Sequence, residues 1–139
     1  MNYTLGDKIR ILSLSEEQIQ LLEEDIVKEL DKNSVDIISK PYYFMLKVDD
    51  LVGTTRVIKS RTSWLEYLND CHKGYIFYRY NEHIFDEVLV AETLDGFPVV
   101  YNLDGRYYIA GNGKHRLTIA KCLGNKIVKV IVYDCKIKE

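Results

Sequence analysis

One short segment of the chain combines glycines with cationic and titratable side chains. It is Gly111-Asn112-Gly113-Lys114-His115-Arg116, and it lies between a β-prone run and an apolar-periodic run that predicts a helix. Glycine lets the backbone approach a ligand closely. The unpaired N–H groups of a helix's first turn favour an anion, and the Lys, His and Arg side chains add charge and donors there. All six residues are therefore predicted to form a phosphate-binding loop.

Each polar side chain of this loop has its own predicted role. Arg116 is the strongest candidate for phosphate contact, because a guanidinium group can bind two oxygens at once. His115 is a candidate catalytic residue, as a phosphate donor or proton shuttle, and a hydrogen bond to a backbone carbonyl is its structural alternative. A cation such as Lys114 is unfavourable at a helix start unless an anion is bound. Asn112 either tolerates a left-handed backbone or donates its amide to the anion.

The loop also has a purely structural interpretation. A Gly-x-Gly pattern is a weak signal by itself, and a strand-to-helix turn with solvated Lys and Arg side chains fits the same residues. The neighbouring elements are what favour the functional interpretation.

Phosphoryl transfer also needs a carboxylate that holds a metal or accepts a proton. Glu92, on a helix predicted ahead of the loop, is the candidate for this carboxylate, although its spacing does not distinguish it from an ordinary surface acid. The cysteines Cys71, Cys122 and Cys135 are widely spaced, and the histidines show no metal-ligand spacing. Buried thiols and no protein-held metal are expected.

The elements around the loop form a regular series. Residues 97–101 and 106–110 are β-prone and flank an Asp-Gly pair, which predicts a hairpin. Apolar spacing over residues 117–123 predicts a helix that ends at Gly124. Residues 127–133 are almost continuously apolar and β-branched, as is typical of a buried strand. The predicted unit is hairpin, glycine loop, helix and strand.

This series resembles the ParB/sulfiredoxin superfamily, which includes ParB-like N-terminal and nuclease-like domains. The motifs that carry the resemblance are Gly-Phe-Pro-Val-Val, Asp-Gly-x-Tyr-Tyr, Gly-x-Gly-x-His-Arg-Leu-x-x-Ala and a Leu-Gly ending before a Val-rich strand, over roughly residues 88–133. The resemblance implies a fold in which the loop and helix start hold nucleotide phosphates. Members use such sites for CTP-gated DNA partitioning, reduction of overoxidised cysteine, serine phosphorylation and hydrolysis of nucleic acids or nucleotides.

Departures from the family pattern narrow these expectations. Sulfiredoxins carry a catalytic cysteine immediately before the His-Arg pair, where this chain has Lys114, so cysteine reduction is not expected. Partition proteins usually show Gly-Glu-Arg-Arg and continue into a helix-turn-helix domain, whereas six residues follow Tyr133 here. Sequence-specific DNA binding is therefore not expected.

The N-terminal region is predicted to be helical. A capping box at Ser15 and Gln18 opens an amphipathic helix that ends near Asn33. Residues 1–40 are therefore predicted as an N-terminal helical extension, and residues 41–139 as the core. At 139 residues the chain is long enough for one domain with its own core, so residues 1–139 are predicted to form a single domain.

Further elements are predicted between this extension and the loop. Residues 43–48 form a predicted strand, and Ser63 caps a helix that reaches about His72. Residues 75–80 form an aromatic-rich strand, and Asn81 caps the helix after it. The chain's many tyrosines either line strands or stack on a nucleobase. The fold class is α/β, with a mixed sheet and surrounding helices.

Composition excludes several classes of protein. The formal charge of −2 and pI of about 5.9 argue against a global nucleic-acid footprint. There is no apolar run of the length that crosses a membrane and no signal-peptide pattern, so a cytoplasmic location without membrane contact is expected.

The leading functional prediction is binding of a nucleoside triphosphate or another phosphate ligand by residues 111–116. Nucleotide hydrolysis or phosphoryl transfer with Mg²⁺ would follow from such binding. One alternative is a non-catalytic interaction protein with a protein partner, such as an immunity, antitoxin, phage or plasmid accessory factor. Another is a nuclease that acts on DNA or RNA through the same loop. The sequence leaves open whether the chain is an enzyme.

Overall fold

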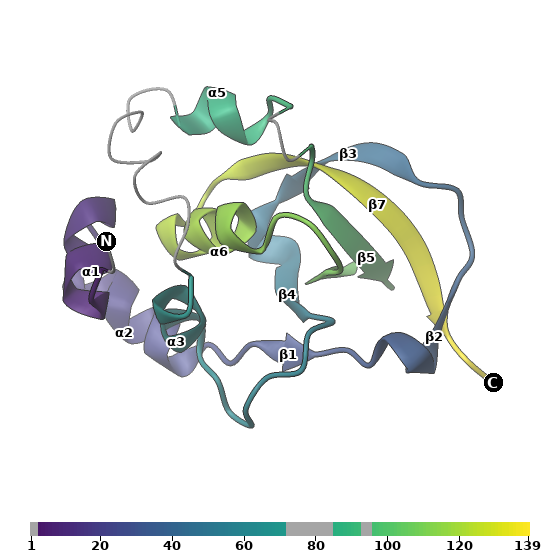
Figure 1. The fold of residues 1–139 in the computed structure, drawn as a ribbon, viewed down its shortest axis with the longest axis horizontal. Coiled ribbons are helices and arrows are strands. Elements are labelled where there is room, and N and C mark those ends of the chain that lie inside the picture. The colour runs from purple at the N-terminus through teal and green to yellow at the C-terminus, as the bar shows by residue number, and fades with distance from the viewer. Residues whose placement is uncertain (1–2, 72–84, 93–95) are drawn as a thin grey trace.

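A curved mixed β-sheet forms the centre of the fold (Figure 1). The computed structural model describes residues 3–71, 85–92 and 96–139. Its strands are β1 (Lys28–Glu29), β2 (Val35–Ile37), β3 (Tyr42–Lys47), β4 (Leu51–Thr54), β5 (Val99–Leu103), β6 (Arg106–Ile109) and β7 (Ile127–Ile137). Their order is β1-β4-β6-β5-β7-β2, and β3 also pairs with β7. Parallel and antiparallel pairs are both present, so the predicted α/β class with a mixed sheet is confirmed.

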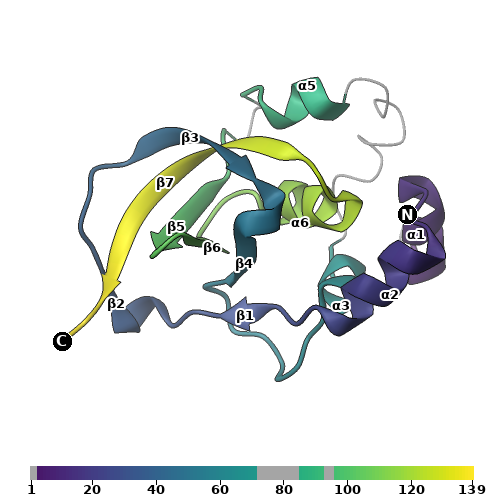
Figure 2. The ribbon, with the colours of Figure 1, turned by 180° about the vertical axis from the view of Figure 1, so that it is seen from behind.

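The helices gather mainly at one end of the sheet. In the described residues they are α1 (Leu5–Leu12), α2 (Glu16–Glu24), α3 (Trp64–Asn69), α5 (Phe85–Leu89) and α6 (Lys114–Leu123), with short 3₁₀ turns at Lys32–Ser34 and Val48–Asp50. α3 contacts α1, α2 and α6, and α6 also contacts β7. α5 lies across α6 from α3 in both views (Figures 1 and 2). The C-terminal residues lie at the end of the molecule opposite α1.

The core joins these helices to the sheet. Trp64 and Leu68 of α3, Leu117 of α6, Ile109 of β6 and Val130 of β7 are all completely buried in one apolar cluster. Full burial of each such side chain contributes about 1.5–3 kcal/mol. The cluster fixes α3 and α6 against each other and against the sheet.

The sheet is curled rather than flat. Phe44 of β3 and Tyr107 of β6 stack with ring centroids 5.6 Å apart, although β7 and β5 lie between their strands. Adjacent strands are spaced at about 4.8 Å, so two strands three places apart in a flat sheet would be about 14 Å apart. The stacking of these rings therefore requires β3 and β6 to approach each other across the concave face.

The elements predicted around the glycine loop are confirmed. Asp104 and Gly105 have φ values of 53° and 82°, which are the left-handed conformations that a two-residue hairpin turn uses between β5 and β6. α6 ends at Gly124, whose φ is 76°. The strand predicted over 127–133 is β7, and it continues to Ile137 because its last residues pair with β2.

Predicted caps and strands ahead of the loop are also confirmed where the structure describes them. Ser15 and Gln18 form the reciprocal capping box of α2. The hydroxyl of Ser63 accepts the backbone N–H of Glu66 at the start of α3. The predicted strand at 43–48 is β3. The predicted strand over 75–80 and the predicted cap at Asn81 lie outside the described residues.

The prediction of a helix from Ser15 to Asn33 is wrong beyond Glu24. β1 follows and pairs in parallel with β4, so the extension at residues 1–40 is only partly helical and supplies two strands to the sheet. The physical reason is a long-range fit at Gly53: a Cβ atom there would lie 1.8 Å from the backbone oxygen of Lys28. The absent side chain lets β1 approach β4, and the leucine that follows, Leu30, donates its N–H to the Thr54 carbonyl at 2.9 Å.

α1 lies within the predicted helical extension, ahead of the helix that was predicted from Ser15. Thr4 caps it, and Asp7 completes the capping box. Its Lys8 side chain is buried, and the Nζ atom donates to the carbonyl of Asn69 at the C-terminal end of α3. α1 is therefore fastened to the same end of α3 that forms part of the site described next. No helix in the described ranges is long and apolar enough to cross a membrane.

Candidate functional site

The predicted phosphate loop is a tight connection between β6 and α6. Gly113 precedes α6 with a φ of 103°, and a Cβ atom there would lie 2.3 Å from the Cβ of Pro98. The backbone carbonyl of Asn112 accepts the N–H of Val99 at 2.9 Å. The glycine is thus required by the turn and by its packing on Pro98, which makes the segment a well-defined start for α6.

The two cationic side chains of this segment, Lys114 and Arg116, have different neighbours in the described part of the chain. Arg116 is half-buried, and its Nη2 atom lies 3.5 Å from the carbonyl oxygen of Gly96. His115 and Gly111 are half-buried as well, whereas Asn112 is exposed. Lys114 lines the pocket described next, and its Nζ atom lies 4.6 Å from the centroid of the Tyr67 ring.

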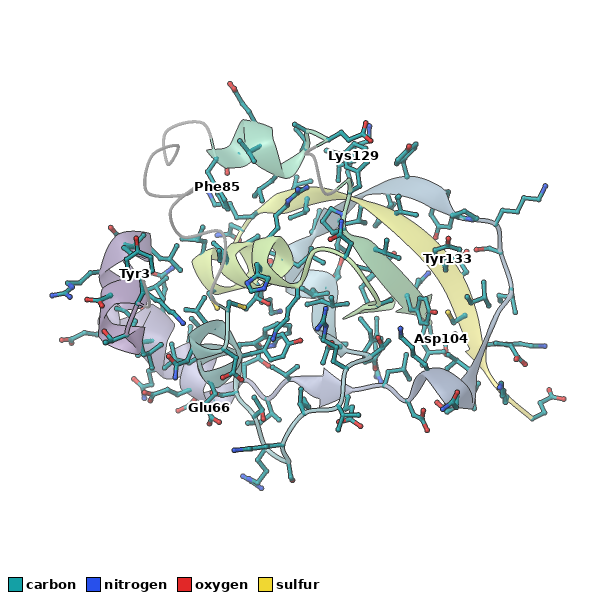
Figure 3. The ribbon with its side chains drawn as sticks, in the orientation of Figure 1. Tyr3, Glu66, Phe85, Asp104, Lys129 and Tyr133 are labelled. Carbon is teal, nitrogen blue, oxygen red and sulfur yellow. The ribbon has the colours of Figure 1, made fainter. Side chains whose placement is uncertain are left out.

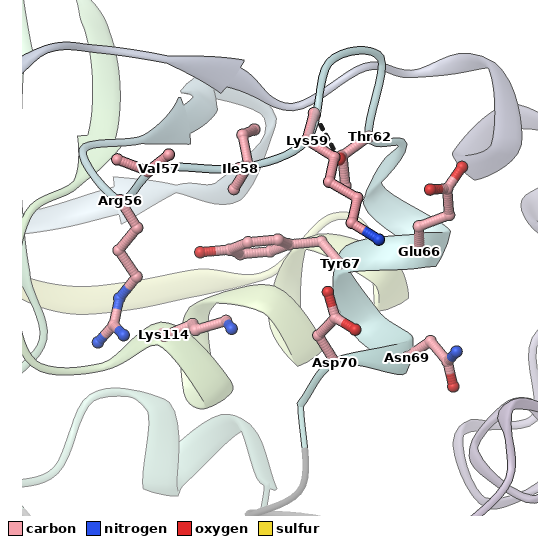
Figure 4. Close-up of a pocket in the computed structure, with 10 residues that line it drawn as sticks. All are labelled: Arg56, Val57, Ile58, Lys59, Thr62, Glu66, Tyr67, Asn69, Asp70 and Lys114. Atoms are coloured by element: carbon pink, nitrogen blue, oxygen red, sulfur yellow. Dashed lines mark hydrogen bonds between the residues drawn. The ribbon is translucent and has the colours of Figure 1, made fainter.

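This pocket has a volume of about 530 Å³ and lies between the loop after β4, helix α3 and the start of α6 (Figure 4). It is lined by Arg56, Val57, Ile58, Lys59, Thr62, Glu66, Tyr67, Asn69, Asp70 and Lys114. A volume of this size is typical of sites for small organic ligands.

The strand pairing explains why these segments meet. β4 and β6 run in parallel, so the residues that follow both strands leave the sheet at the same edge. The N–H of Thr55 donates to the carbonyl of Ile109 at 2.8 Å. This hydrogen bond links the segment that follows β4 to the end of β6. Ligands commonly bind outside the carboxyl ends of parallel strands in α/β folds. Arg56 and Lys114 therefore reach the same pocket from distant parts of the sequence.

Hydrogen bonds hold the pocket loop after β4 in shape. The N–H of Arg56 donates to Thr54 Oγ1 at 3.1 Å, and the N–H of Ile58 donates to a carboxylate oxygen of Glu29 at 2.9 Å. Near α3, the hydroxyl of Thr62 donates to the carbonyl of Lys59 at 2.6 Å (Figure 4). The loop is anchored at its start, middle and end, so its cationic side chains project from a fixed backbone.

Tyr67 forms a wall of the pocket. The residue is only 2% exposed, and its ring packs edge-on against Trp64 with centroids 5.7 Å apart. Its hydroxyl lies 3.3 Å from Thr54 Oγ1. Burial raises the pKa of the Tyr67 phenol, so the hydroxyl is neutral at physiological pH. The Tyr67 side chain is therefore a buried, un-ionised part of the pocket wall, with the Lys114 ammonium group over its ring.

The pocket carries three cations and two carboxylates. Arg56, Lys59 and Lys114 are the cations, and Glu66 and Asp70 are the acids. Within the described part of the chain, ion pairs form between Arg10 and Asp7 and between Lys126 and Asp86, and both lie elsewhere. The charges of the pocket are therefore not neutralised by direct ion pairs within the described residues, and they remain available to a ligand.

The predicted catalytic acid lies apart from this pocket. Glu92 is exposed, follows the C-terminal end of α5 and does not line the pocket. Figure 3 shows Glu66, which the sequence analysis did not select, on the side of the molecule opposite Phe85 of α5. The carboxylates that line the pocket are Glu66 and Asp70, and Glu92 is not among them.

Four further pocket residues also escaped the sequence analysis, namely Arg56, Lys59, Tyr67 and Asp70. A signal was present, because Arg56 and Lys59 directly follow the short apolar run that forms β4. Treating that run as a strand parallel to β6 would have placed these cations beside the glycine loop.

The cysteines are all buried, as predicted. Burial raises the pKa of each of the three thiols, so they are protonated at neutral pH. Among the described residues, no group of three or more His, Cys, Asp or Glu side chains is placed to hold a metal ion.

No protein-family model, curated protein or solved structure matches the chain. The resemblance to the ParB/sulfiredoxin superfamily therefore rests on the sequence motifs over roughly residues 88–133 and their order.

Proposed function

We propose that the protein binds a small phosphorylated ligand, of which a nucleotide is the leading example, in the pocket at the start of α6. The observation that carries this proposal is the convergence of three cations from two distant segments around the buried Tyr67 ring. Arg56 offers a planar fork for two phosphate oxygens, and Lys59 and Lys114 offer mobile charges.

The position of Lys114 supports an anionic ligand in particular. It is the first residue of α6, and no side chain caps that helix. A cation in the first turn is disfavoured by the helix dipole. An anion held between this helix end and the Lys114 ammonium group would remove that unfavourable interaction.

The volume of the pocket supports an organic ligand rather than free phosphate alone. At about 530 Å³ it exceeds what a phosphate ion needs. A nucleoside triphosphate would bring Mg²⁺, for which Glu66 and Asp70 are the oxygen donors within the pocket. When bound, the ion would neutralise charge on the phosphates.

Ligand binding is a stronger proposal than catalysis. His115 and Glu92, the predicted catalytic residues, do not line the pocket. Hydrolysis or phosphoryl transfer would need a proton acceptor within hydrogen-bond reach of the reacting group. Glu66 and Asp70 are the carboxylates that such a reaction would have to use.

The test is thermal unfolding with inorganic phosphate, AMP, ATP, CTP and GTP, each with and without Mg²⁺. A ligand at 100 times its dissociation constant adds about 2.7 kcal/mol of stability, which raises the midpoint by several degrees. We expect at least one nucleotide to do so in the wild type. Arg56→Gln and Lys114→Gln should each weaken binding about tenfold, because hydrogen bonds to charged groups contribute about 1.5–3 kcal/mol.

Arg106→Gln is the matched control for Arg56→Gln. Arg106 is also exposed, but it lies in the β5–β6 hairpin and does not line the pocket. The Arg106→Gln variant should show the same nucleotide-induced rise in the unfolding midpoint as the wild type. The absence of any shift in the wild type, or an equal loss in Arg56→Gln and Arg106→Gln, would contradict the proposal.

A further inference from the structure

A buried lysine contacts the wall of the pocket without lining it. Lys8 of α1 is only 1% exposed, although lysine side chains are almost never fully buried unless they are paired. Its Nζ atom donates to the backbone carbonyl of Asn69, the last residue of α3. Asn69 lines the pocket, as do Tyr67 before it and Asp70 after it. A side chain 61 residues away in sequence therefore holds the end of the helix that forms this wall.

The short helix α3 depends on contacts of this kind. The last carbonyl groups of a helix have no partner within it, and a cation near them interacts favourably with the helix dipole. α3 has only six residues, so its contacts with other elements determine its position more than its own hydrogen bonds do. In the described residues those elements include α1, α2 and α6. Lys8 supplies both a cation and a donor at the C-terminal end of α3.

The position of α3 affects the proposed anion contacts. Tyr67 belongs to α3, and the Lys114 ammonium group at the start of α6 lies over its ring, 4.6 Å from the centroid. Figure 4 shows the Arg56 guanidinium and Lys114 on the same side of that ring. A shift of α3 would therefore displace the surface against which Lys114 lies. Displacements of about 1 Å are enough to weaken a site that depends on several converging groups.

We propose that Lys8 is a positioning residue of the pocket, and that its contact with Asn69 sets the affinity for the phosphorylated ligand. This inference rests on the proposed phosphate-binding function and adds a residue that does not touch the ligand. Coupling between two sites is reciprocal, so ligand binding also stabilises the packing of α1 on α3. α1 has eight residues, and an isolated helix of that length is marginal in water, so α1 depends on this packing.

The experiment measures the binding of ATP and of inorganic pyrophosphate by isothermal titration calorimetry, well below the unfolding midpoint of every variant. Lys8→Met keeps most of the apolar part of the side chain and removes the donor. It should bind both ligands about tenfold more weakly than the wild type, because the support of the pocket wall is lost.

Two control variants separate positioning from other effects. Arg10→Gln changes an exposed residue of the same helix and should bind both ligands like the wild type. Gly105→Ala strains the β5–β6 hairpin, which does not line the pocket, so it lowers stability without altering affinity. If the wild type binds neither ligand, the proposed function fails and this inference fails with it. If the wild type binds and Lys8→Met binds equally well, or loses no more affinity than Gly105→Ala, this inference alone is overturned.

Hydrogen exchange in the wild type tests the reciprocal effect without any substitution. Saturating ATP should slow the exchange of the Ile11 and Leu12 amides in the last turn of α1. The amides of Asp36 and Lys136, where β2 pairs with β7 at the opposite end of the molecule, should exchange as before. Unchanged exchange in α1 at saturating ATP would overturn the inference even if Lys8→Met does not fold.

Discussion

The pocket beside α3 and the outer face of β3 are two surfaces with contrasting chemistry. The pocket gathers charged side chains around a buried ring on a hydrogen-bonded backbone. The β3 face exposes apolar side chains, with Tyr43 64% and Met45 50% exposed. Lys129, a cation on that face, lies 5.0 Å from the Tyr43 ring centroid and 5.1 Å from that of Phe97. Figure 3 shows Lys129 on the side of the molecule opposite Glu66.

This difference determines what each surface can specify. Charged groups act over a distance and require particular donors or acceptors, so the side chains of the pocket restrict which ligand could bind there. Exposed apolar side chains favour burial without selecting what buries them. The pocket therefore carries a functional proposal, whereas the β3 face carries none.

The largest expected effect is a loss of stability in the framework of the pocket, where β1 pairs with β4. Gly53→Ala would place a Cβ atom 1.8 Å from the Lys28 backbone oxygen, so β1 and β4 must move apart. We expect a loss of about 3 kcal/mol in the free energy of unfolding, measured in urea, because buried overpacking against backbone is costly.

Gly105→Ala is the control for Gly53→Ala. Nothing lies within 4 Å of a Cβ atom at Gly105, and its φ of 82° gives only the cost of a left-handed alanine, about 1–2 kcal/mol. Equal losses in the two variants would show that β1 and β4 do not approach as closely as described.

The second prediction concerns the brace between α1 and the pocket. Lys8→Ala removes the buried aliphatic part of the side chain and the donor to the Asn69 carbonyl. We therefore expect a loss of about 2 kcal/mol in the free energy of unfolding. Arg10→Ala on the same helix removes an exposed side chain whose surface ion pair with Asp7 is screened by solvent, so its effect on unfolding free energy should be much smaller. A Lys8→Ala variant as stable as the wild type would contradict the role of α1 as a brace.

The third prediction is a pH dependence at the β3 edge. Burial and the 2.6 Å hydrogen bond to Asp134 raise the pKa of Tyr42 to about 12. Because the folded pKa exceeds the unfolded value of about 10, the contribution of Tyr42 to stability is complete below pH 10. It is lost as the pH rises from 10 toward 12. Urea midpoints at pH 9, 10 and 11 should fall less steeply in Tyr42→Phe than in the wild type.

Tyr43→Phe provides the comparison for Tyr42→Phe on the neighbouring residue, whose ring is more exposed. It should retain the wild-type slope over the same pH range. If Tyr42→Phe has that slope as well, the hydrogen bond to Asp134 makes no measurable contribution.

The smallest effect is expected on the exposed face of β3. Met45→Thr replaces a half-exposed side chain by one that also favours strands, so its effect on stability should stay within about 0.5 kcal/mol. It should also leave nucleotide binding unchanged, since Met45 does not line the pocket. A large loss of nucleotide binding in this variant would remove the distinction between the two surfaces.

Local signals allowed much of the fold to be predicted. The Asp104-Gly105 pair specifies a hairpin turn, Gly124 ends α6, and Ser15 and Ser63 begin helices, because each acts on residues a few positions away. β1 and β4 were missed because they are short and depend on contact between Gly53 and a residue far away in the chain.

The candidate site was harder to predict than the fold for the same physical reason. Lys114 was selected from its local sequence, whereas Arg56 joins it only through the parallel pairing of β4 and β6. Arg116 has the side chain best suited to phosphate, yet it reaches toward the Gly96 carbonyl. Residue type alone does not determine which way a side chain leaves its helix.

The most direct test of the account is a ¹H–¹⁵N NMR titration of the wild type with the nucleotide that gives the largest thermal shift. The account predicts that the amide signals of Arg56, Lys59, Tyr67 and Lys114 move in a saturable manner, while those of Tyr43 and Met45 stay in place. Saturable shifts centred on β3, or on the Gly96–Arg116 contact with the pocket signals unmoved, would contradict the assignment of the pocket as the ligand site.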